Sequence, residues 1–151
     1  MLAVPMLEAT AQRQKETQLR NALHEIRTAL DAYHQAALDK RIEVAADASG
    51  YPPDLDSLAT GVKDITRPDG RPVYFLRRLP RDPTLQELVD ERYLRTLPID
   101  PITESADTWL LDPPPEAAVG DPAAADSAIR IYNLHSGAEG NASDGTPFSE
   151  L

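Results

Sequence analysis

The clearest pattern in the chain is Leu19-Arg-Asn-Ala-Leu-His-Glu-Ile-Arg-Thr-Ala-Leu-Asp-Ala-Tyr33, in which apolar residues recur every three or four positions. This spacing places the apolar side chains on one face of a helix. No Gly or Pro follows Pro5 until residue 50, so we expect one continuous helix over residues 5–40. At about 1.5 Å per residue, such a helix would extend over roughly 50 Å, more than a domain of this size needs across its core.

The first half of this helix lacks the apolar face of the second half. Residues 8–18 read Glu-Ala-Thr-Ala-Gln-Arg-Gln-Lys-Glu-Thr-Gln, which are good helix formers with almost nothing to bury. We therefore expect residues 1–18 to form an exposed helical segment, here called the stem, and residues 19–151 to form a globular domain. A stem without a core to join projects into solvent or packs on a partner, which favours assembly over catalysis.

The composition fits one domain and argues against several classes of protein. The chain of 151 residues contains no Cys, which rules out disulfides, thiol nucleophiles and thiolate metal sites. Its net charge is −10, and residues 104–151 hold nine acidic residues and a single base, Arg130. This distribution argues against a nucleic-acid surface, because phosphate binding needs clustered Lys and Arg. The sequence contains no apolar run of about 18 residues, so no segment of it is predicted to span a membrane.

Short elements are expected after the long helix. Asp54 is placed to cap a short helix that Gly61 ends, and a capping box predicts a second one over residues 84–93. Strands are predicted over residues 71–77, 108–112 and 129–135, with loops over 112–126 and 136–151. The order predicts an α+β fold in which a small antiparallel sheet of about three strands packs on the apolar half of the helix.

The predicted core joins the helix to this sheet. Four helix residues are expected to pack against four residues of the last two strands: Leu23, Ile26, Leu30 and Tyr33 against Trp109, Leu111, Ile131 and Leu134.

The histidines do not form a recognisable catalytic or metal motif. His24-Glu25 resembles the start of a zinc-protease helix motif, but Thr28 stands where the second histidine would be required. His34 is ten residues from His24, which is not a ligand spacing. His135 precedes Ser136, yet the sequence contains no nucleophile elbow. We therefore assign no catalytic residue and expect a protein that is not an enzyme.

Residues 136–145 are the most serious candidate for a metal site. This loop offers oxygen ligands from Glu139, Asn141, Ser143 and Asp144. Calcium takes six to eight oxygens, several of them from carboxylates, and two carboxylates are few. The spacing of an EF-hand is absent as well. We expect a Gly-rich loop held by Asx turns and assign no metal ion and no cofactor.

Four phrases recur in an order typical of one protein family: Leu30-Asp-Ala-Tyr33, Tyr51-Pro-Pro-Asp-Leu-Asp-Ser-Leu58, Leu97-Pro-Ile-Asp-Pro101 and Ser136-Gly-Ala-Glu-Gly140. Together with Ala3-Val-Pro5 ahead of a polar helix, they resemble the type II secretion pseudopilins. The resemblance is to the major pseudopilin within the type IV pilin-like superfamily, and it runs over nearly the whole length. It implies a pilin-like fold, with a long N-terminal helix packed on a small antiparallel sheet.

The resemblance also implies a function. A pseudopilin is a structural subunit that polymerises with its own copies and with minor pseudopilins in the periplasm of a Gram-negative bacterium. The fibre helps to drive folded proteins across the outer membrane, and its subunits contact inner-membrane components of the secretion system. The alternatives are a minor pseudopilin, a type IV pilus pilin or, from another class, a soluble ligand-binding or hydrolytic domain.

Two departures from the family bear on these expectations. The family's cleavage Gly, the following Phe, the glutamate five residues into the mature protein and most of the membrane helix are missing. The chain therefore looks like a soluble domain that reaches the inner membrane only through that missing helix, and we expect it to be monomeric or weakly associating. The calcium-binding members end in Gly-Thr-x-Asp-Asp, whereas this chain reads Asp144-Gly-Thr-Pro-Phe148 and lacks a second Asp.

Overall fold

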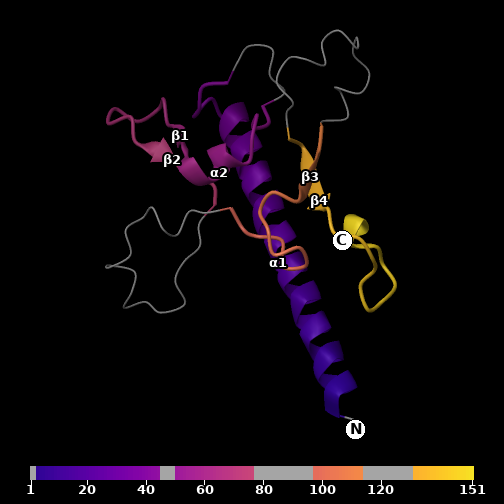
Figure 1. Cartoon of the computed structure of the whole chain (residues 1–151). Coiled ribbons are helices and arrows are strands. Elements are labelled where there is room, and N and C mark those ends of the chain that lie inside the picture. Colours follow the sequence, from indigo (N-terminus) through magenta and orange to yellow (C-terminus); the bar gives the residue numbers. More distant parts are fainter. Residues whose placement is uncertain (1–2, 45–49, 77–96, 114–130) are drawn as a thin grey trace, which may run out of the picture.

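The computed structural model describes residues 3–44, 50–76, 97–113 and 131–151, with side chains from Pro5 onward. It shows an α+β protein built on one long helix, α1 (Ala3–Leu38), which runs the length of the molecule in Figure 1. The other elements, in chain order, are α2 (Asp56–Thr60), β1 (Val62–Lys63), β2 (Pro72–Val73), β3 (Trp109–Asp112), β4 (Asn133–Ser136) and the 3-10 helix η4 (Phe148–Glu150). Within the residues described, no helix combines the length and the apolarity needed to cross a membrane.

The long helix is confirmed nearly to its predicted ends. Pro5 lies in its first turn, where a missing N–H group costs nothing. At the other end Lys40 adopts a left-handed conformation with φ of 55°. The Lys40 N–H donates to Ala37 O and the Arg41 N–H to Ala36 O, the two bonds of a Schellman motif. This turn ends α1 and sends the chain toward β1.

The core lies along the C-terminal half of α1, from Leu19 to Ala36. The apolar stripe expected from the sequence is buried, including Leu23, Ile26, Leu30 and Tyr33. It packs with α2 and β4, and the residues that complete the core around it are Leu55, Leu58, Leu76, Trp109, Ile131, Leu134 and Phe148. Of the eight core residues predicted, only Leu111 is wrong, because its side chain is 41% exposed. Leu111 pairs with Leu134 across the sheet, but β4 is the strand that packs on α1, so Leu111 lies one strand away from the helix.

The strands form two small sheets in the described part of the chain, not one sheet of about three strands. β3 and β4 pair antiparallel in the register Trp109 with Ser136 and Asp112 with Asn133. The strand predicted over 71–77 is only two residues long, and it pairs with β1 in a separate hairpin. β4 begins four residues later than the strand predicted over 129–135. The helix expected over 84–93 and most of the loop expected over 112–126 lie outside the described residues.

The short helix predicted after Asp54 is confirmed. Asp54 Oδ1 accepts a hydrogen bond of 2.7 Å from the Ser57 N–H, so it satisfies a free donor in the first turn of α2. Gly61 follows the helix with φ of 85°, and a Cβ at this position would lie 2.7 Å from the Tyr74 ring. Gly is therefore required here on both conformational and steric grounds.

Candidate functional site

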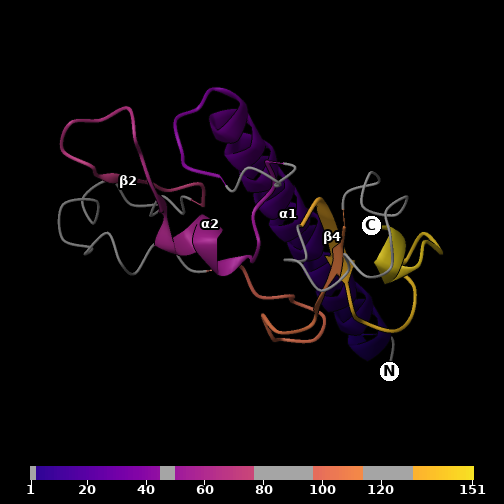
Figure 2. The same cartoon turned by 90° about the horizontal axis from the view of Figure 1, so that it is seen from above.

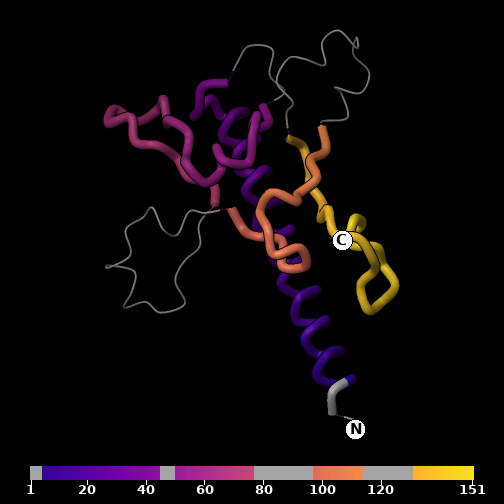
Figure 3. The backbone as a smooth tube through the Cα atoms, in the orientation of Figure 1, coloured from indigo at the N-terminus to yellow at the C-terminus, as the bar shows by residue number. Residues whose placement is uncertain are grey.

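In the N-terminal part of α1, residues 5–14 are all exposed in the described structure. Met6 is 73% exposed and Leu7 68% exposed, although both are large apolar side chains. The backbone trace in Figure 3 shows this part of the helix extending away from every other described segment. The exposed part ends earlier than residue 18, because Glu16 is only 3% exposed.

Glu16 is buried because the C-terminal loop closes over it. Glu16 Oε1 accepts a hydrogen bond of 2.8 Å from the Ser143 N–H, and Oε2 accepts one of 2.7 Å from Ser143 Oγ. Gln12 Nε2 donates a further bond of 3.2 Å to Oε1. The hydrogen bond from the Ser143 side chain is the largest influence on the pKa of Glu16, which it holds below the ordinary glutamate range despite the opposing effect of burial.

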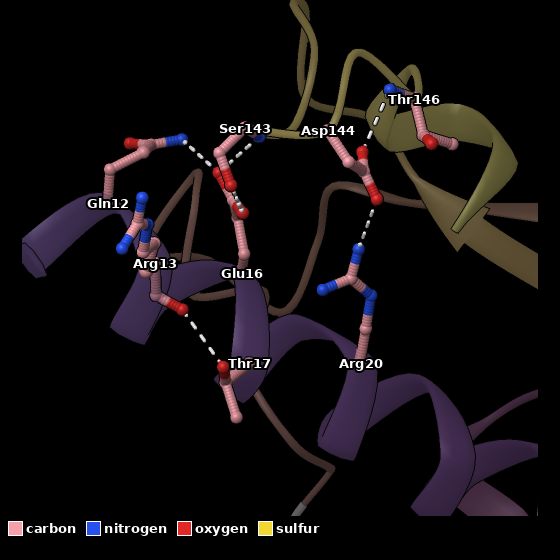
Figure 4. A network of polar contacts seen from close by, with 8 residues as sticks. All are labelled: Gln12, Arg13, Glu16, Thr17, Arg20, Ser143, Asp144 and Thr146. Atoms are coloured by element: carbon pink, nitrogen blue, oxygen red, sulfur yellow. Dashed lines mark hydrogen bonds and ion pairs between the residues drawn. The ribbon is translucent and has the colours of Figure 1, made fainter. Parts of the chain in front are cut away.

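A second contact lies one helical turn further along α1. Arg20 Nη2 is 3.1 Å from Asp144 Oδ2, as Figure 4 shows next to the Glu16 contact. Asp144 Oδ1 accepts a hydrogen bond of 2.9 Å from the Thr146 N–H. This bond is the largest cause that lowers the pKa of Asp144, with smaller contributions from the Thr146 side chain and the Arg20 charge. Glu16, Arg20, Ser143 and Asp144 together are called the clasp below.

The clasp engages two of the candidate calcium ligands in the loop over residues 136–145. The Asp144 to Thr146 bond is an Asx turn of the kind expected for this loop. Ser143 and Asp144, two of the four candidate ligands, are both bonded to side chains of α1. Glu139 and Asn141 are exposed. In the described part of the chain, no group of three or more His, Asp or Glu residues is placed to hold a metal ion.

Arg27 forms another connection between the helix and the end of the chain. Its guanidinium donates bonds of 2.9 to 3.0 Å to Asn133 Oδ1, Leu134 O and Leu151 O. Three donors of one planar group therefore bind β4 and the C-terminal residue at once. The C-terminal half of α1 is thus attached to β4 and to the end of the chain by the hydrogen bonds of Arg27 as well as by apolar packing.

The three histidines lie in different surroundings. His24 is exposed, and His34 stacks on the Tyr51 ring with 4.2 Å between centroids. His135 Nδ1 lies 3.3 Å from Asp112 Oδ2. Its neighbour Ser136 is buried and donates its hydroxyl to Asp100 Oδ2. His135 and Ser136 therefore contact different carboxylates, and the serine hydroxyl does not face the imidazole.

Asp100 has a structural role that the sequence did not predict. It is fully buried, and its Oδ1 accepts a hydrogen bond of 2.9 Å from the Ile102 N–H. Its bond with Ser136 joins the phrase that ends in Pro101 to the phrase that begins at Ser136. Trp109 Nε1 adds a bond of 2.9 Å to Pro98 O. The sequence segments 97–101 and 136–140, which are far apart in the chain, are therefore in contact in the structure.

Sequence reasoning missed the clasp and Asp100, for different reasons. Glu16 stands in a polar run whose pattern gives no sign of burial, and its partner is 127 residues away. Asp100 stands in an Asp-Pro turn, where a local role is evident but a long-range bond is not.

Comparison of the chain with family models, curated proteins and solved structures found no match.

Proposed function

We propose that this protein is the major structural subunit of a type II secretion pseudopilus, the domain of an inner-membrane pseudopilin that lies in the periplasm. One observation carries the proposal: α1 is continuous over 36 residues, yet residues 5–14 are all exposed in the described structure. A helix of this length without a core to join is suited to pack against the equivalent helices of other copies. Met6 and Leu7 supply the apolar side chains that a monomer leaves exposed.

The attachment of the stem supports the same function. A fibre subunit has to pass force between the helix that holds the fibre together and the globular domain on its surface. The clasp and the Arg27 bonds connect the helix to the C-terminal segment at Glu16, at Arg20 one turn further on, and at Arg27 about two turns beyond Arg20. The polymer would contain minor pseudopilins and meet inner-membrane components of the secretion system, as the family resemblance implies.

The pilin-like fold belongs to this proposal as well. The long N-terminal helix supports it, and so does the bond between Asp100 and Ser136, which links two of the phrases that carry the resemblance. The resemblance implies one small sheet of about three strands, whereas the described residues form two sheets of two strands each. Among the residues that the structure describes, no specific feature favours the ligand-binding or hydrolytic alternative over assembly.

A membrane assembly experiment tests the proposal. An apolar helix of about 20 residues, placed before Met1 in the reading frame of α1, would supply a membrane-spanning segment. We expect this extended protein to form fibres in the inner membrane of a cell that carries a type II secretion system, as seen by electron microscopy of sheared material. A helix of equal length with a polar sequence is the matched control. Membrane insertion of the extended protein without any fibre would contradict the proposal.

A further inference from the structure

Among the residues that the structure describes, the β1–β2 hairpin and the C-terminal segment differ in charge. The hairpin of β1 and β2 carries three bases, Lys63, Arg67 and Arg71, and two acids, Asp64 and Asp69. Arg41, at the end of α1, lies beside the hairpin through its ion pair with Asp64, and Glu43 follows it in the chain. Residues 131–151 carry Glu139, Asp144 and Glu150 and no Lys or Arg. In a chain whose net charge is −10, the hairpin is therefore a local cationic surface.

The hairpin is organised by a buried carboxylate, Asp64, whereas Lys63 and Arg71 are exposed. Asp64 is 1% exposed, and its Oδ1 accepts bonds from the Thr66 N–H and hydroxyl. Its Oδ2 lies 3.2 Å from Arg41 and 3.4 Å from Arg67. Arg71 lies beside Asp69 at 3.3 Å but is 77% exposed. Lys63 forms no ion pair with another described residue. The bonds of Asp64 therefore fix the hairpin, and Lys63 and Arg71 are charges that it exposes to solvent.

The acidic surface, on the C-terminal segment over residues 131–151, is also held in place by hydrogen bonds and an ion pair. Asp144 is held by Arg20 and by the Thr146 N–H, so its position is fixed by the clasp. Glu139 and Glu150 are exposed, and neither forms an ion pair with another described residue. η4, which contains Glu150, packs on β4. These carboxylates therefore project from an ordered segment.

The two surfaces lie on opposite sides of the long helix. Figures 1 and 2, which are views at right angles, both place the β1–β2 hairpin on one side of α1 and the C-terminal segment on the other. Ion pairs between them within one molecule are thus excluded by this arrangement. A second copy placed beside the first could bring its acidic segment to the cationic hairpin, with the long helices side by side.

We propose that the β1–β2 hairpin of one copy docks on the C-terminal segment of the next copy, with Lys63 and Arg71 facing Glu139 and Glu150. Because the two surfaces lie on opposite sides of α1, two copies cannot readily form the contact in both directions at once. The contact is therefore heterologous and repeats along a row of subunits. Its charges set the register and direction of the row more than its strength. This inference rests on the proposed function, and it names the faces through which subunits meet outside the stem.

Zero-length cross-linking tests the contact directly. The chain has only three lysines, Lys15, Lys40 and Lys63, so a carbodiimide that joins lysine to carboxylate gives an interpretable map. Equal amounts of ¹⁴N- and ¹⁵N-labelled 151-residue chain are cross-linked at low salt and analysed by mass spectrometry, which separates links between copies from links within one. We expect Lys63 to join Glu139 or Glu150 of another copy, and salt of about 0.5 M to abolish this link. Lys40, which is exposed near the same end of α1, is the internal control.

Charge reversal gives a second, independent measurement. The variant Lys63→Glu with Arg71→Glu leaves Arg41 and Arg67 to neutralise buried Asp64, so its fold is kept and is checked by thermal melting. The partner variant is Glu139→Lys with Glu150→Lys. Each variant alone should lose the copy-to-copy links between hairpin and C-terminal segment, and a mixture of the two should regain them. Reversal of Arg13 on the stem is the matched control and should leave the wild-type links unchanged.

The outcomes separate this inference from the proposed function. Lys63 links no more frequent than Lys40 links, or links that lead mainly to helix carboxylates such as Glu8, would overturn the inference. Failure of the mixed variants to regain the links would do the same. If fibres form without these links, the inference alone is wrong. If the links form but the membrane-extended protein makes no fibre, the pseudopilus proposal fails and the contact remains.

Discussion

At the scale of single residues, three carboxylates work by accepting hydrogen bonds from the chain rather than by chemistry on a substrate. Glu16 and Asp144 hold the C-terminal loop to α1, and Asp64 organises the β1–β2 hairpin. The pKa of each is lowered, in the first place by hydrogen bonds from Ser143, Thr146 and Thr66 respectively. The bonds favour the charged form, so protonation and folding are linked.

The direction of this linkage gives a prediction about pH. Because the pKa of each of the three carboxylates is lower in the folded than in the unfolded chain, their stabilisation is complete above the unfolded pKa. It is lost as pH falls through the folded pKa. Melting temperature should therefore drop as pH falls below about 4.5, the ordinary value for glutamate. Melts between about pH 7 and pH 3 measure it.

Substitution of Glu16 isolates its share of that effect. Glu16→Gln keeps one acceptor for Ser143 but cannot be charged, so this variant should melt lower than wild type at pH 7 and converge on it in acid. Glu8→Gln, on the exposed part of the stem, is the matched control and should follow the wild-type curve. Parallel curves for Glu16→Gln and wild type across the whole range would show that the clasp carboxylate does not couple to folding.

Core residues give a second prediction at this scale. Leu30 is 1% exposed on the buried face of α1, whereas Leu111 is 41% exposed. Leu30→Ala should lower the free energy of unfolding by about 2–5 kcal/mol, the range for deletion of a fully buried leucine side chain. Leu111→Ala should cost distinctly less, because water already reaches the side chain. Denaturant unfolding of both variants measures the difference, and equal losses would show that the assigned burial is wrong.

At the scale of elements, what the sequence could predict depended on how local each signal was. The span of α1 and its core face follow from a periodicity repeated over many residues, and α2 follows from Asp54 and Gly61 at its two ends. β1 and β2 are two residues each, too short for any alternation to be visible. The clasp joins residues 124 to 127 positions apart, so no local pattern could reveal it. The exposed stem was predictable for the opposite reason, since the lack of an apolar face is itself a local property.

The loop over residues 136–145 carries a prediction about calcium. Its carboxylates are few, and the clasp bonds Ser143 and Asp144 to α1, so we expect no tight calcium site. Melting with excess calcium and with a chelator should give the same temperature, and calorimetry should detect no binding. A site saturated at a hundredfold its dissociation constant would add about 2.7 kcal/mol and would raise the melting temperature visibly. Such a rise, abolished by Asp144→Asn, would overturn the expectation.

At the scale of the whole molecule, the architecture separates a part that is complete in the monomer from a part that is not. The globular part has a continuous core along α1, with polar connections at Arg27 and at the clasp. Residues 5–14 have neither. A charged hairpin and an acidic segment then lie on opposite flanks of the helix (Figure 2). A single copy therefore leaves both a helical and an electrostatic surface without a partner.

These surfaces together are too weak for a stable oligomer of this chain, which gives the last prediction. The apolar side chains of the stem near its start are Leu2, Val4, Met6 and Leu7, far less area than the roughly 1,600 Å² of a standard interface. The net charge of −10 makes copies repel one another at low salt, which opposes the local attraction of the hairpin. Sedimentation at micromolar concentration should therefore give a monomer or a weakly associating species. A membrane helix would hold neighbours together and raise their effective concentration, so that contacts too weak to associate free chains could order a fibre. A tight oligomer that persists in high salt would mean that the globular part has a strong interface of its own, and the role of the stem would have to be revised.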